Sequence, residues 1–251
     1  MIATMVGRIW TVFVAIAIAI AGPAGEVLAG PPSVGALFSN SHRHFCTGAV
    51  VSGGAGDIVV TAAHCLYGRG FRRRVFFVPR YDRGRRPYGT WTSTTMLVDR
   101  RWRLRHDADL DFGFIVLRPR YGRRIASVVG ANTLITNPGF HNLIRVIGYP
   151  SRSDRAVVCD SVTHRFGRFQ LRFYCPGFYG GTSGSPFLRH YSKRRRTGEI
   201  MGVIGGYQAG GAYSYLSYSA YFDHDIRRLY GQVESLDRLP RARHRQVRHR
   251  R

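Results

Sequence analysis

The chain has 251 residues, which is enough for one large β unit or for two smaller halves with sizeable cores. Hydrophobic residues make up 44% of it and aromatic residues 13%, a globular composition that excludes disorder over most of the length. Lys and Arg outnumber Asp and Glu by 38 to 14, and the formal net charge of +24 favours contact with polyanions without saying anything about the fold.

The first 29 residues have the pattern of a secretory signal peptide. A short basic region that ends at Arg8 precedes an apolar stretch over 9–21. Residues 27–29, Val-Leu-Ala, form the small-x-small pattern after which signal peptidases cut. We expect cleavage after Ala29, with cleavage after Ala24 as the alternative, and a secreted mature chain. The apolar stretch is shorter than the about 20 residues of a membrane-spanning helix, so we expect no membrane contact after the signal is removed, with an uncleaved anchor as the alternative.

The chain from residue 34 onward is a succession of short β segments. Runs of β-branched and aromatic residues alternate with Gly, Pro, Asn and Asp, and this spacing predicts many short antiparallel strands. Strands are expected at 34–38, 47–52, 58–61, 75–78, 112–117 and 143–147. The Gly- and Arg-containing stretch 119–131 is the expected boundary between two strand-rich halves, which we assign to 30–122 and 123–237.

One helix is predicted near the end of the chain, over 223–233. Ile226, Leu229 and Val233 recur there at three- and four-residue intervals, with an acidic residue near the start and Gly231 near the end. The segment that follows, 238–251, is dominated by Arg and His and has no apolar periodicity, so we expect a basic, disordered tail.

The strongest chemical signal is the glycine-flanked serine in the segment 180–186, Gly-Gly-Thr-Ser-Gly-Ser-Pro. Glycines beside a nucleophile let the backbone turn tightly and direct several N–H groups at one point. In a protease-like arrangement, Ser183 would be the nucleophile, and the N–H groups of Gly181 and Ser183 would bind the oxyanion. The alternative is a Gly- and Ser-rich surface turn.

The second signal is a histidine that follows an apolar strand. In the segment 61–65, Thr-Ala-Ala-His-Cys, two small residues precede His64. A serine hydroxyl is a weak nucleophile at neutral pH and needs a neutral imidazole within hydrogen-bond reach to accept its proton. Small neighbours leave room for that contact, which makes His64 the candidate general base.

The third signal is an acidic residue at the entrance of an apolar run, 109–117. A carboxylate that enters a buried strand is costly unless it is paired, and an imidazole N–H is a suitable partner because the contact also fixes the tautomer. Asp107, Asp109 and Asp111 all compete for this role on the pattern alone. A solvent-facing acid at the start of the strand is the alternative.

The three segments together resemble the chymotrypsin/trypsin-like (S1-type) serine peptidases, and in particular the secreted bacterial branch related to the glutamyl endopeptidases. The family's aspartate matches best at Asp111, and the chain order His, Asp, Ser is the family's order. The resemblance covers nearly all of the mature chain. It implies an all-β fold of two antiparallel six-stranded β-barrels with a C-terminal helix, the first barrel carrying His64 and Asp111 and the second carrying Ser183.

Four cysteines in an exported chain predict two disulfides, and their number alone leaves three pairings open. The resemblance implies that Cys46 pairs with Cys65, and that Cys159 pairs with Cys175. Zinc binding by Cys46, His64 and Cys65 is an alternative, but adjacent His and Cys residues are unlike the usual ligand spacing. We therefore predict no metal and no cofactor.

The sequence departs from the family in the parts that control activation. No Arg-Ile-Val-like activation site precedes the strand at 34–38, and Thr182 stands where the family has the aspartate that receives a freed N-terminal amine. We therefore expect that export alone yields active enzyme.

The specificity pocket also departs from the family. The resemblance places Gly177 and Phe178 at its base and wall, with Ile204, Gly205 and Tyr207 along the other side. No carboxylate lies there, which argues against a preference for Lys or Arg. Ile204 stands where the glutamyl endopeptidases have a histidine, which argues against a preference for acidic residues. We expect an apolar or small residue before the scissile bond.

Two functions follow from these features. The first is a serine endopeptidase that cleaves proteins or peptides through an acyl-enzyme. The second is a pseudoprotease, a secreted basic protein that uses the protease fold to bind acidic polymers. Arginine clusters at 72–74, 100–105 and 193–196 support polyanion contact, with solvated surface charge as the alternative. Because the arginines are scattered among strands, we expect no specific nucleic-acid partner.

Overall fold

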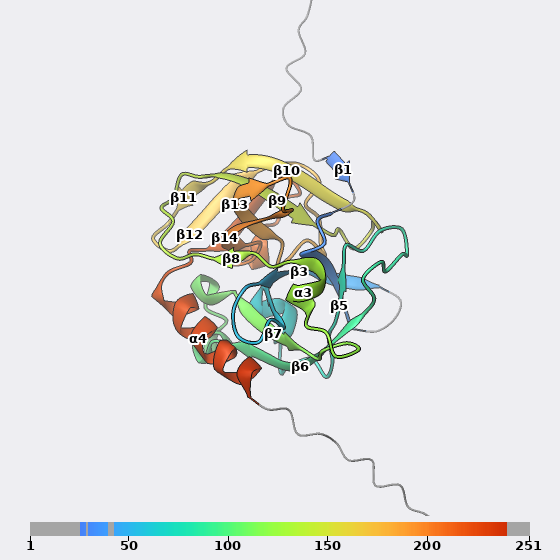
Figure 1. Ribbon diagram of the computed structural model, residues 1–251. Coiled ribbons are helices and arrows are strands. Elements are labelled where there is room, and N and C mark those ends of the chain that lie inside the picture. The colour runs from blue at the N-terminus through green and yellow to red at the C-terminus, as the bar shows by residue number, and fades with distance from the viewer. Residues whose placement is uncertain (1–25, 29, 40–42, 240–251) are drawn as a thin grey trace, which may run out of the picture.

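The computed structural model describes residues 26–28, 30–39 and 43–239, and Figure 1 shows how their elements are arranged. The predicted signal peptide, 1–29, lies outside these residues except for 26–28, and the predicted tail, 238–251, lies outside them from 240 onward. Within the described ranges, no helix is both long enough and apolar enough to cross a membrane.

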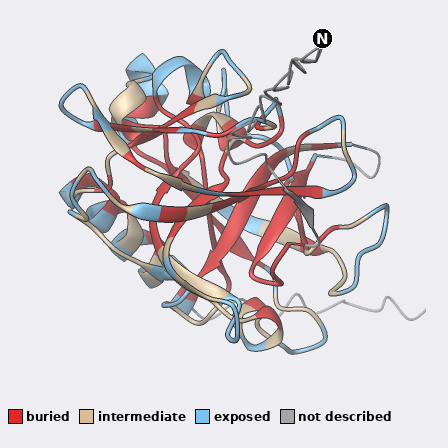
Figure 2. Ribbon diagram, turned by 90° about the horizontal axis from the view of Figure 1, so that it is seen from above, coloured by how far each residue is buried: buried red, intermediate tan, exposed pale blue. Residues whose placement is uncertain are grey.

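The first half of the chain forms a closed six-stranded barrel. Its strands are ordered β2-β3-β4-β7-β6-β5, each antiparallel to its neighbours, and β5 pairs with β2 to close the ring. The apolar and β-branched side chains of these strands fill the interior, and Figure 2 shows the buried residues running along them. The bounds are β2 (Val34–Phe38), β3 (His44–Val51), β4 (Ile58–Thr61), β5 (Phe76–Pro79), β6 (Trp91–Val98) and β7 (Gly113–Leu117).

The second half has two sheets packed around one apolar core. One sheet has the order β1-β10-β9-β13-β14-β8 and the other the order β11-β12-β15. Phe173, Phe187 and Met201 are fully buried in the core that the two sheets share. The bounds are β1 (Glu26–Leu28), β8 (Thr133–Leu134), β9 (Leu143–Gly148), β10 (Ala156–Val162), β11 (His164–Phe166), β12 (Gln170–Tyr174), β13 (Pro186–Ser192), β14 (Thr197–Val203) and β15 (Leu216–Ala220).

The predicted all-β fold with a C-terminal helix is therefore confirmed, with one difference in its second half. The sheet that contains β9 and β10 also includes β1 and a parallel partner, β8, instead of continuing into β12 as a single antiparallel ring. The disulfide between Cys159 and Cys175 ties β10 to the end of β12, and thus joins the two sheets covalently.

The helices are short except for the last one, α4. Ile226, Leu229 and Val233 lie on its buried face, which packs against the first barrel rather than against the second half that precedes it in the chain. The bounds are α1 (Ala63–Leu66), α2 (Arg100–Arg105), α3 (Ile125–Val129) and α4 (His224–Arg238), with single turns η1 (Ala108–Leu110) and η2 (Tyr207–Gly210).

Helix α4 runs five residues beyond the predicted end at 233. The side chain of Asp223 caps its start by accepting a hydrogen bond from the Asp225 N–H, as the acidic residue near the start led us to expect. At the other end, Asp237 Oδ2 accepts hydrogen bonds from the N–H groups of Ala55 and Asp57, at 2.7 and 3.1 Å. These contacts with a distant loop hold the last turn in place, and Gly231 does not end the helix.

Candidate active site

The pairing of β4 with β7 brings the candidate base and acid together. Thr61 at the end of β4 lies opposite Gly113 at the start of β7. His64 follows β4 on the short helix α1, and Asp111 precedes β7. Two segments about fifty residues apart in the sequence therefore meet at one end of the first barrel.

Asp111 and His64 are joined by two hydrogen bonds. The His64 Nδ1 lies 2.7 Å from Asp111 Oδ2, and the His64 backbone N–H donates to Asp111 Oδ1 at 2.9 Å. The Asp111 side chain is fully buried, whereas that of His64 is 23% exposed. The carboxylate accepts a hydrogen bond from the Nδ1–H group and so favours the tautomer with its proton on Nδ1. The neutral imidazole then keeps a lone pair on Nε2, the nitrogen that acts as the general base.

The two competing carboxylates have other partners. Asp107 accepts a hydrogen bond from the Asp109 N–H and caps η1. Asp109 Oδ1 accepts one from Gln170 Nε2 at 2.6 Å. The structure therefore brings Asp111, and neither Asp107 nor Asp109, into contact with His64.

A further group at the carboxylate is the backbone of Gly206. Its N–H donates to Asp111 Oδ2 at 2.8 Å, so the carboxylate accepts hydrogen bonds from His64 and from the second half of the chain at once. Sequence reasoning missed this contact because it involves a backbone group, which leaves no signature in the residue type.

The loop that carries Ser183 is held against the first barrel. The carbonyl oxygen of Ser183 accepts a hydrogen bond from the Thr47 N–H on β3 at 2.8 Å, and the Gly184 N–H donates to the carbonyl of Ile204 at 2.7 Å. Cys65, the residue after His64, also lies against Ser183, with its sulfur 3.8 Å from the Ser183 carbonyl oxygen. The loop therefore sits at the junction of the two halves, beside the segment that carries His64.

Glycine is required on both sides of the serine. Gly181 has φ +98°, and a Cβ there would lie 2.4 Å from the Ser151 nitrogen. Gly184 has φ +82°, and a Cβ there would fall inside the contact distance of Thr61 Oγ1 and the Thr47 carbonyl. A larger residue at Gly184 would push the loop off the first barrel, and one at Gly181 would push it off the backbone of Tyr149 and Ser151, so the two glycines fix the position of Ser183.

Two backbone donors of this loop are unused. Among the described residues, the N–H groups of Gly181 and Ser183 donate no hydrogen bond, although those of Thr182, Gly184 and Ser185 do. The half-buried Ser183 hydroxyl likewise forms no hydrogen bond within the described chain, with His64 or otherwise. The serine loop therefore keeps two N–H donors, on either side of Thr182, free for a ligand, and an oxyanion hole is built from free donors of this kind.

Thr182 has a partner within its own loop. Its side chain is almost fully buried, and its hydroxyl donates to the carbonyl oxygen of Tyr179 at 2.7 Å. A buried aspartate at this position would need a cation, whereas the threonine hydroxyl is satisfied locally. The Thr182 side chain therefore needs no partner outside its own loop.

A cavity of about 280 Å³ opens beside Ser183. Phe178 and Ile204, which we expect in the specificity pocket, line this cavity, and Tyr213, Ser214 and Ser217 contribute further walls. None of its lining residues carries a charge. A larger cavity of about 730 Å³ lies over β9 and β10 and contains none of the candidate catalytic residues.

The other residues predicted for the pocket lie outside its walls. Gly205 packs against Asp111, where an added Cβ would lie 2.8 Å from the Asp111 carbonyl oxygen. The 42%-exposed Tyr207 packs its ring against Phe166 and Tyr218. Gly177 precedes Phe178 in the turn but does not line the cavity. The wall comes instead from the segment 208–217, which carries no side-chain pattern that distinguishes it in the sequence.

Both implied disulfides are present. Cys46 is bonded to Cys65, which clamps β3 to the helix that carries His64, and Cys159 is bonded to Cys175. The sulfurs of Cys46 and Cys65 lie near His64, but a disulfide offers no thiolate to a metal ion.

Comparison with known proteins finds one family model and several solved structures that are similar to this chain. The family model described as Trypsin matches residues 23–221. The protease Anisep from Arthrobacter nicotinovorans has a similar structure, with a TM-score of 0.74, 23% identity, and 83% of this chain and 98% of that chain covered. A thermostable serine protease from an extremophilic microorganism is also similar, with a TM-score of 0.72 and 24% identity. The match covers 81% of this chain and 97% of that chain.

A Glu endopeptidase, solved in complex with MPD, is similar with a TM-score of 0.67 and 16% identity, covering 87% of this chain and 100% of that chain. No curated protein sequence matches the chain significantly. The family model spans well over half of the chain, and the structural matches share its fold. The chain therefore belongs to the trypsin family and has the fold of the chymotrypsin-like serine proteases.

Proposed function

We propose that this protein is a secreted serine endopeptidase in which Ser183 is the nucleophile, His64 the general base and Asp111 the group that orients His64. The observation that carries the proposal is the buried Asp111 carboxylate bonded to His64 Nδ1 at 2.7 Å, beside a serine loop with two unused N–H groups. Each of these features is costly in a protein that does not use it, because buried acids and unpaired donors destabilise the folded state.

The chemistry follows from the positions of these groups. His64 Nε2 accepts the proton of the Ser183 hydroxyl as its oxygen attacks the scissile carbonyl carbon, and Asp111 stabilises the imidazolium that forms. The N–H groups of Gly181 and Ser183 bind the oxyanion of the tetrahedral intermediate. The imidazolium then protonates the leaving amine, and a water activated by the same base hydrolyses the acyl-enzyme.

The uncharged cavity beside Ser183 supports a preference for an apolar or small residue before the scissile bond. Binding Lys or Arg there would bury a cation without a carboxylate partner, and binding Asp or Glu would bury an anion without a cation. Phe178 and Ile204 offer apolar surface in place of either partner.

Secretion rests on the signal-like pattern of residues 1–29 and on two disulfides, which form in oxidising compartments. Strand β1 (Glu26–Leu28) pairs with β10 and would be removed by cleavage after Ala29, whereas cleavage after Ala24 would retain it. The mass of the exported protein distinguishes cleavage after Ala24 from cleavage after Ala29.

The experiment is cleavage of a peptide library by the secreted protein and by two variants. Ser183→Ala should reduce kcat by at least about 10⁴-fold, and Asp111→Asn by about 10⁴-fold because the imidazole then loses the tautomer that it needs, with little change in KM. Equal activity of the parent and Ser183→Ala would refute the proposal, provided that circular dichroism shows both to be folded.

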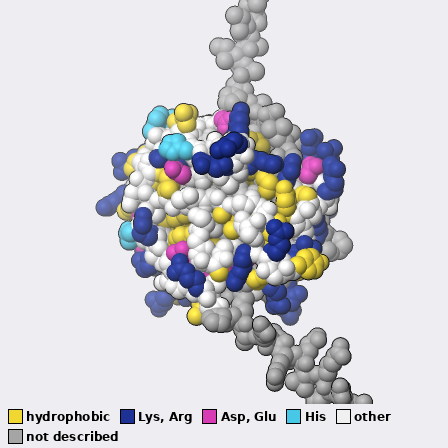
Figure 3. All heavy atoms as spheres, viewed as in Figure 1, with side chains coloured by type: hydrophobic (Ala, Val, Ile, Leu, Met, Phe, Trp, Pro, Cys, Tyr) yellow, Lys and Arg dark blue, Asp and Glu magenta, His cyan; other side chains and the backbone are white. Residues whose placement is uncertain are grey.

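A binding protein for acidic polymers that lacks catalysis is the second candidate. The net charge of +24 favours it, and Figure 3 shows Lys and Arg side chains spread over the visible face with few Asp or Glu between them. Loss of polymer binding in raised salt, together with no peptide cleavage, would favour this candidate over the first.

A further inference from the structure

Two arginine-rich segments meet on one face of the first barrel. Residues 69–74, Arg-Gly-Phe-Arg-Arg-Arg, follow the helix that carries His64, and residues 100–105, Arg-Arg-Trp-Arg-Leu-Arg, form α2. A cavity of about 420 Å³ is lined by Phe71 from the first segment, by Arg100 and Arg103 from the second, and by Arg228 from α4. The two segments, far apart in the sequence, therefore form one surface.

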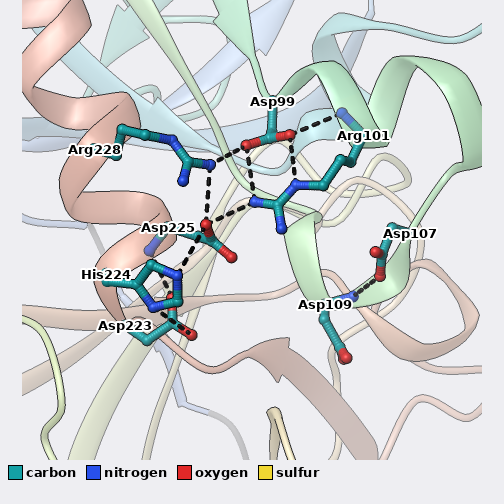
Figure 4. Close-up of polar contacts among 8 residues, drawn as sticks. All are labelled: Asp99, Arg101, Asp107, Asp109, Asp223, His224, Asp225 and Arg228. Atoms are coloured by element: carbon teal, nitrogen blue, oxygen red, sulfur yellow. Dashed lines mark hydrogen bonds and ion pairs between the residues drawn. The ribbon is translucent and has the colours of Figure 1, made fainter.

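The acids on this surface are already paired. As Figure 4 shows, Asp99 and Asp225 lie between two arginines. Arg101 contacts Asp99 at 3.1 Å and Asp225 at 2.6 Å, and Arg228 contacts the same two acids at 2.8 and 2.9 Å. Burial acts to raise the pKa of Asp99, but hydrogen bonds from Arg101 and Arg228 hold it below its ordinary value. Two acids and two arginines thus neutralise one another.

The other arginines of the two segments have no such partner. All are exposed, and within the described part of the chain none forms an ion pair with Asp or Glu. They are Arg69, Arg73, Arg74, Arg100, Arg103 and Arg105. Like charges this close repel one another, so the surface favours a ligand that brings several negative charges at once.

Apolar side chains lie among these arginines. Phe71 is 41% exposed and Leu104 is 63% exposed, and Met96, Leu97 and Leu229 line the cavity between the segments. A sulfated polysaccharide has no apolar side chain to place there. An acidic polypeptide with Leu, Phe or similar residues between its carboxylates complements both features of the surface.

The surface adjoins the candidate catalytic residues. Arg72 Nε donates to the carbonyl oxygen of Cys65 at 2.7 Å, and Cys65 follows His64 directly. On the other side, α2 leads through η1 to Asp111. Both segments of the surface are therefore joined to the candidate catalytic residues His64 and Asp111 by short stretches of chain.

We propose that this face, defined by residues 69–74 and 100–105, is a docking surface for an acidic segment of the polypeptide substrate, outside the residues that flank the scissile bond. The inference rests on the proposed endopeptidase function and names the substrate class for it. The acidic segment adds binding energy remote from the bond that is cut, and this raises kcat/KM at low ionic strength.

The test compares two synthetic peptides with the same cleaved core. One peptide carries an added block of Asp, Glu and Leu, and the other carries a block of Asn, Gln and Leu in the same order. Each block is tested first at the N-terminus and then at the C-terminus of the core. The ratio of kcat/KM for the acidic and neutral peptides should exceed about 10 at low salt and approach 1 at about 0.5 M salt, where exposed charges are screened within a few ångströms.

Charge-reversal variants locate the effect. Arg100→Glu/Arg103→Glu and Arg73→Glu/Arg74→Glu should each lower the ratio at least about fivefold. The matched control, Arg194→Glu/Arg195→Glu, changes the net charge equally at exposed positions between β13 and β14, and it should keep the parent ratio. A parent ratio near 1, or an equal loss in the control, would overturn the proposal.

Two further outcomes are informative. If heparin binds with the same dependence on these four arginines while the peptide ratio is 1, the surface serves a polysaccharide and the proposal is wrong. If Ser183 proves unreactive, the endopeptidase function fails on its own. Anisotropy of the fluorescently labelled acidic peptide then tests the docking surface separately, and binding to the parent that both variants lose supports it.

Discussion

At the scale of single residues, the arrangement around Asp111 controls the position of His64. The carboxylate is fully buried and accepts hydrogen bonds from the His64 ring, the His64 backbone and the Gly206 backbone. Gly205 lies directly against it, and an added Cβ would approach Asp111 Oδ2 to 3.0 Å. The second half of the chain therefore closes over the acid with its backbone and leaves no room for a side chain.

We therefore expect Gly205→Ala to lower kcat/KM by about 10- to 100-fold, because a shift of Asp111 by a fraction of an ångström misplaces the histidine. The matched control is Gly231→Ala on α4, where nothing lies within 4 Å of the added methyl group. Gly231→Ala should leave activity unchanged and add up to about 1 kcal/mol of stability. Steady-state kinetics and urea unfolding measure the two effects, and full activity of Gly205→Ala would contradict the argument.

At the scale of elements, the stability of α4 depends on contacts made beyond its apolar face. Asp237 is almost fully buried and accepts hydrogen bonds from the N–H groups of Ala55 and Asp57 in the loop before β4. The loop and the end of the helix therefore order each other.

Asp237→Ala should destabilise the protein by about 2–4 kcal/mol, because it removes an acceptor from the half-buried N–H group of Ala55 and from the buried N–H group of Asp57. The neighbouring variant Arg238→Ala removes a 62%-exposed side chain and should change the free energy of unfolding by less than about 0.5 kcal/mol. Urea unfolding monitored by circular dichroism gives both values. Equal midpoints for the two variants would show that the loop contact contributes little.

His44, at the start of β3, should make the stability of the protein depend on pH. Burial lowers the pKa of His44 below its ordinary value of 6.5, while a hydrogen bond with the Ser153 carbonyl and the charge of Asp154 partly oppose the shift. The unfolded chain therefore binds a proton at this residue more readily than the folded one. Stability should fall as the pH decreases below 6.5, with a contribution of up to about 1.4 kcal/mol per pH unit.

His44→Gln should reduce that slope, whereas His190→Gln, which replaces a 67%-exposed side chain, should preserve it. Unfolding free energies measured between pH 5 and about 7.5 decide the point. If His44→Gln leaves the slope of unfolding free energy against pH unaltered, the pH dependence comes from other groups.

At the scale of the whole molecule, the apolar core of the first barrel extends into the second half, which also has a separate core of its own. Buried residues of the first barrel pack in the same cluster as Tyr149, Val203 and Phe222 of the second half and as the apolar face of α4. Although the predicted boundary between 122 and 123 lies in the connection between β7 and β8, we expect the halves to unfold together.

Tryptophan fluorescence tests this expectation, because Trp91 and Trp102 both lie in the first half and both are buried. Their denaturant transition should coincide with the far-ultraviolet circular dichroism transition, which reports strands of both halves. Different midpoints would show two units that unfold independently.

Several parts of the fold could be predicted from the sequence because local pattern determines them. Strand β4, Ile58–Thr61, is wholly buried and apolar up to its last residue, and its predicted bounds agree with the observed ones. The last turn of α4 could not be predicted, because Asp237 acts on a loop about 180 residues earlier.

Part of the candidate site could also be predicted from the sequence, and part of it could not. The glycines around Ser183 mark its loop directly, but three acids within five residues are equivalent as a pattern, and only tertiary contact distinguishes Asp111 from Asp107 and Asp109. The segment 208–217 forms much of the cavity wall through its backbone path, with Gln208 and Ala209 at positive φ, and residue type does not specify that path.

The most direct test of the proposed catalytic serine is the intact mass of the secreted protein after exposure to a fluorophosphonate, which reacts only with activated serine hydroxyls. We expect one adduct on the parent and none on Ser183→Ala, with both proteins folded by circular dichroism. No adduct on the folded parent would contradict an activated Ser183, and would leave the arginine-rich surface as the functional part of the molecule.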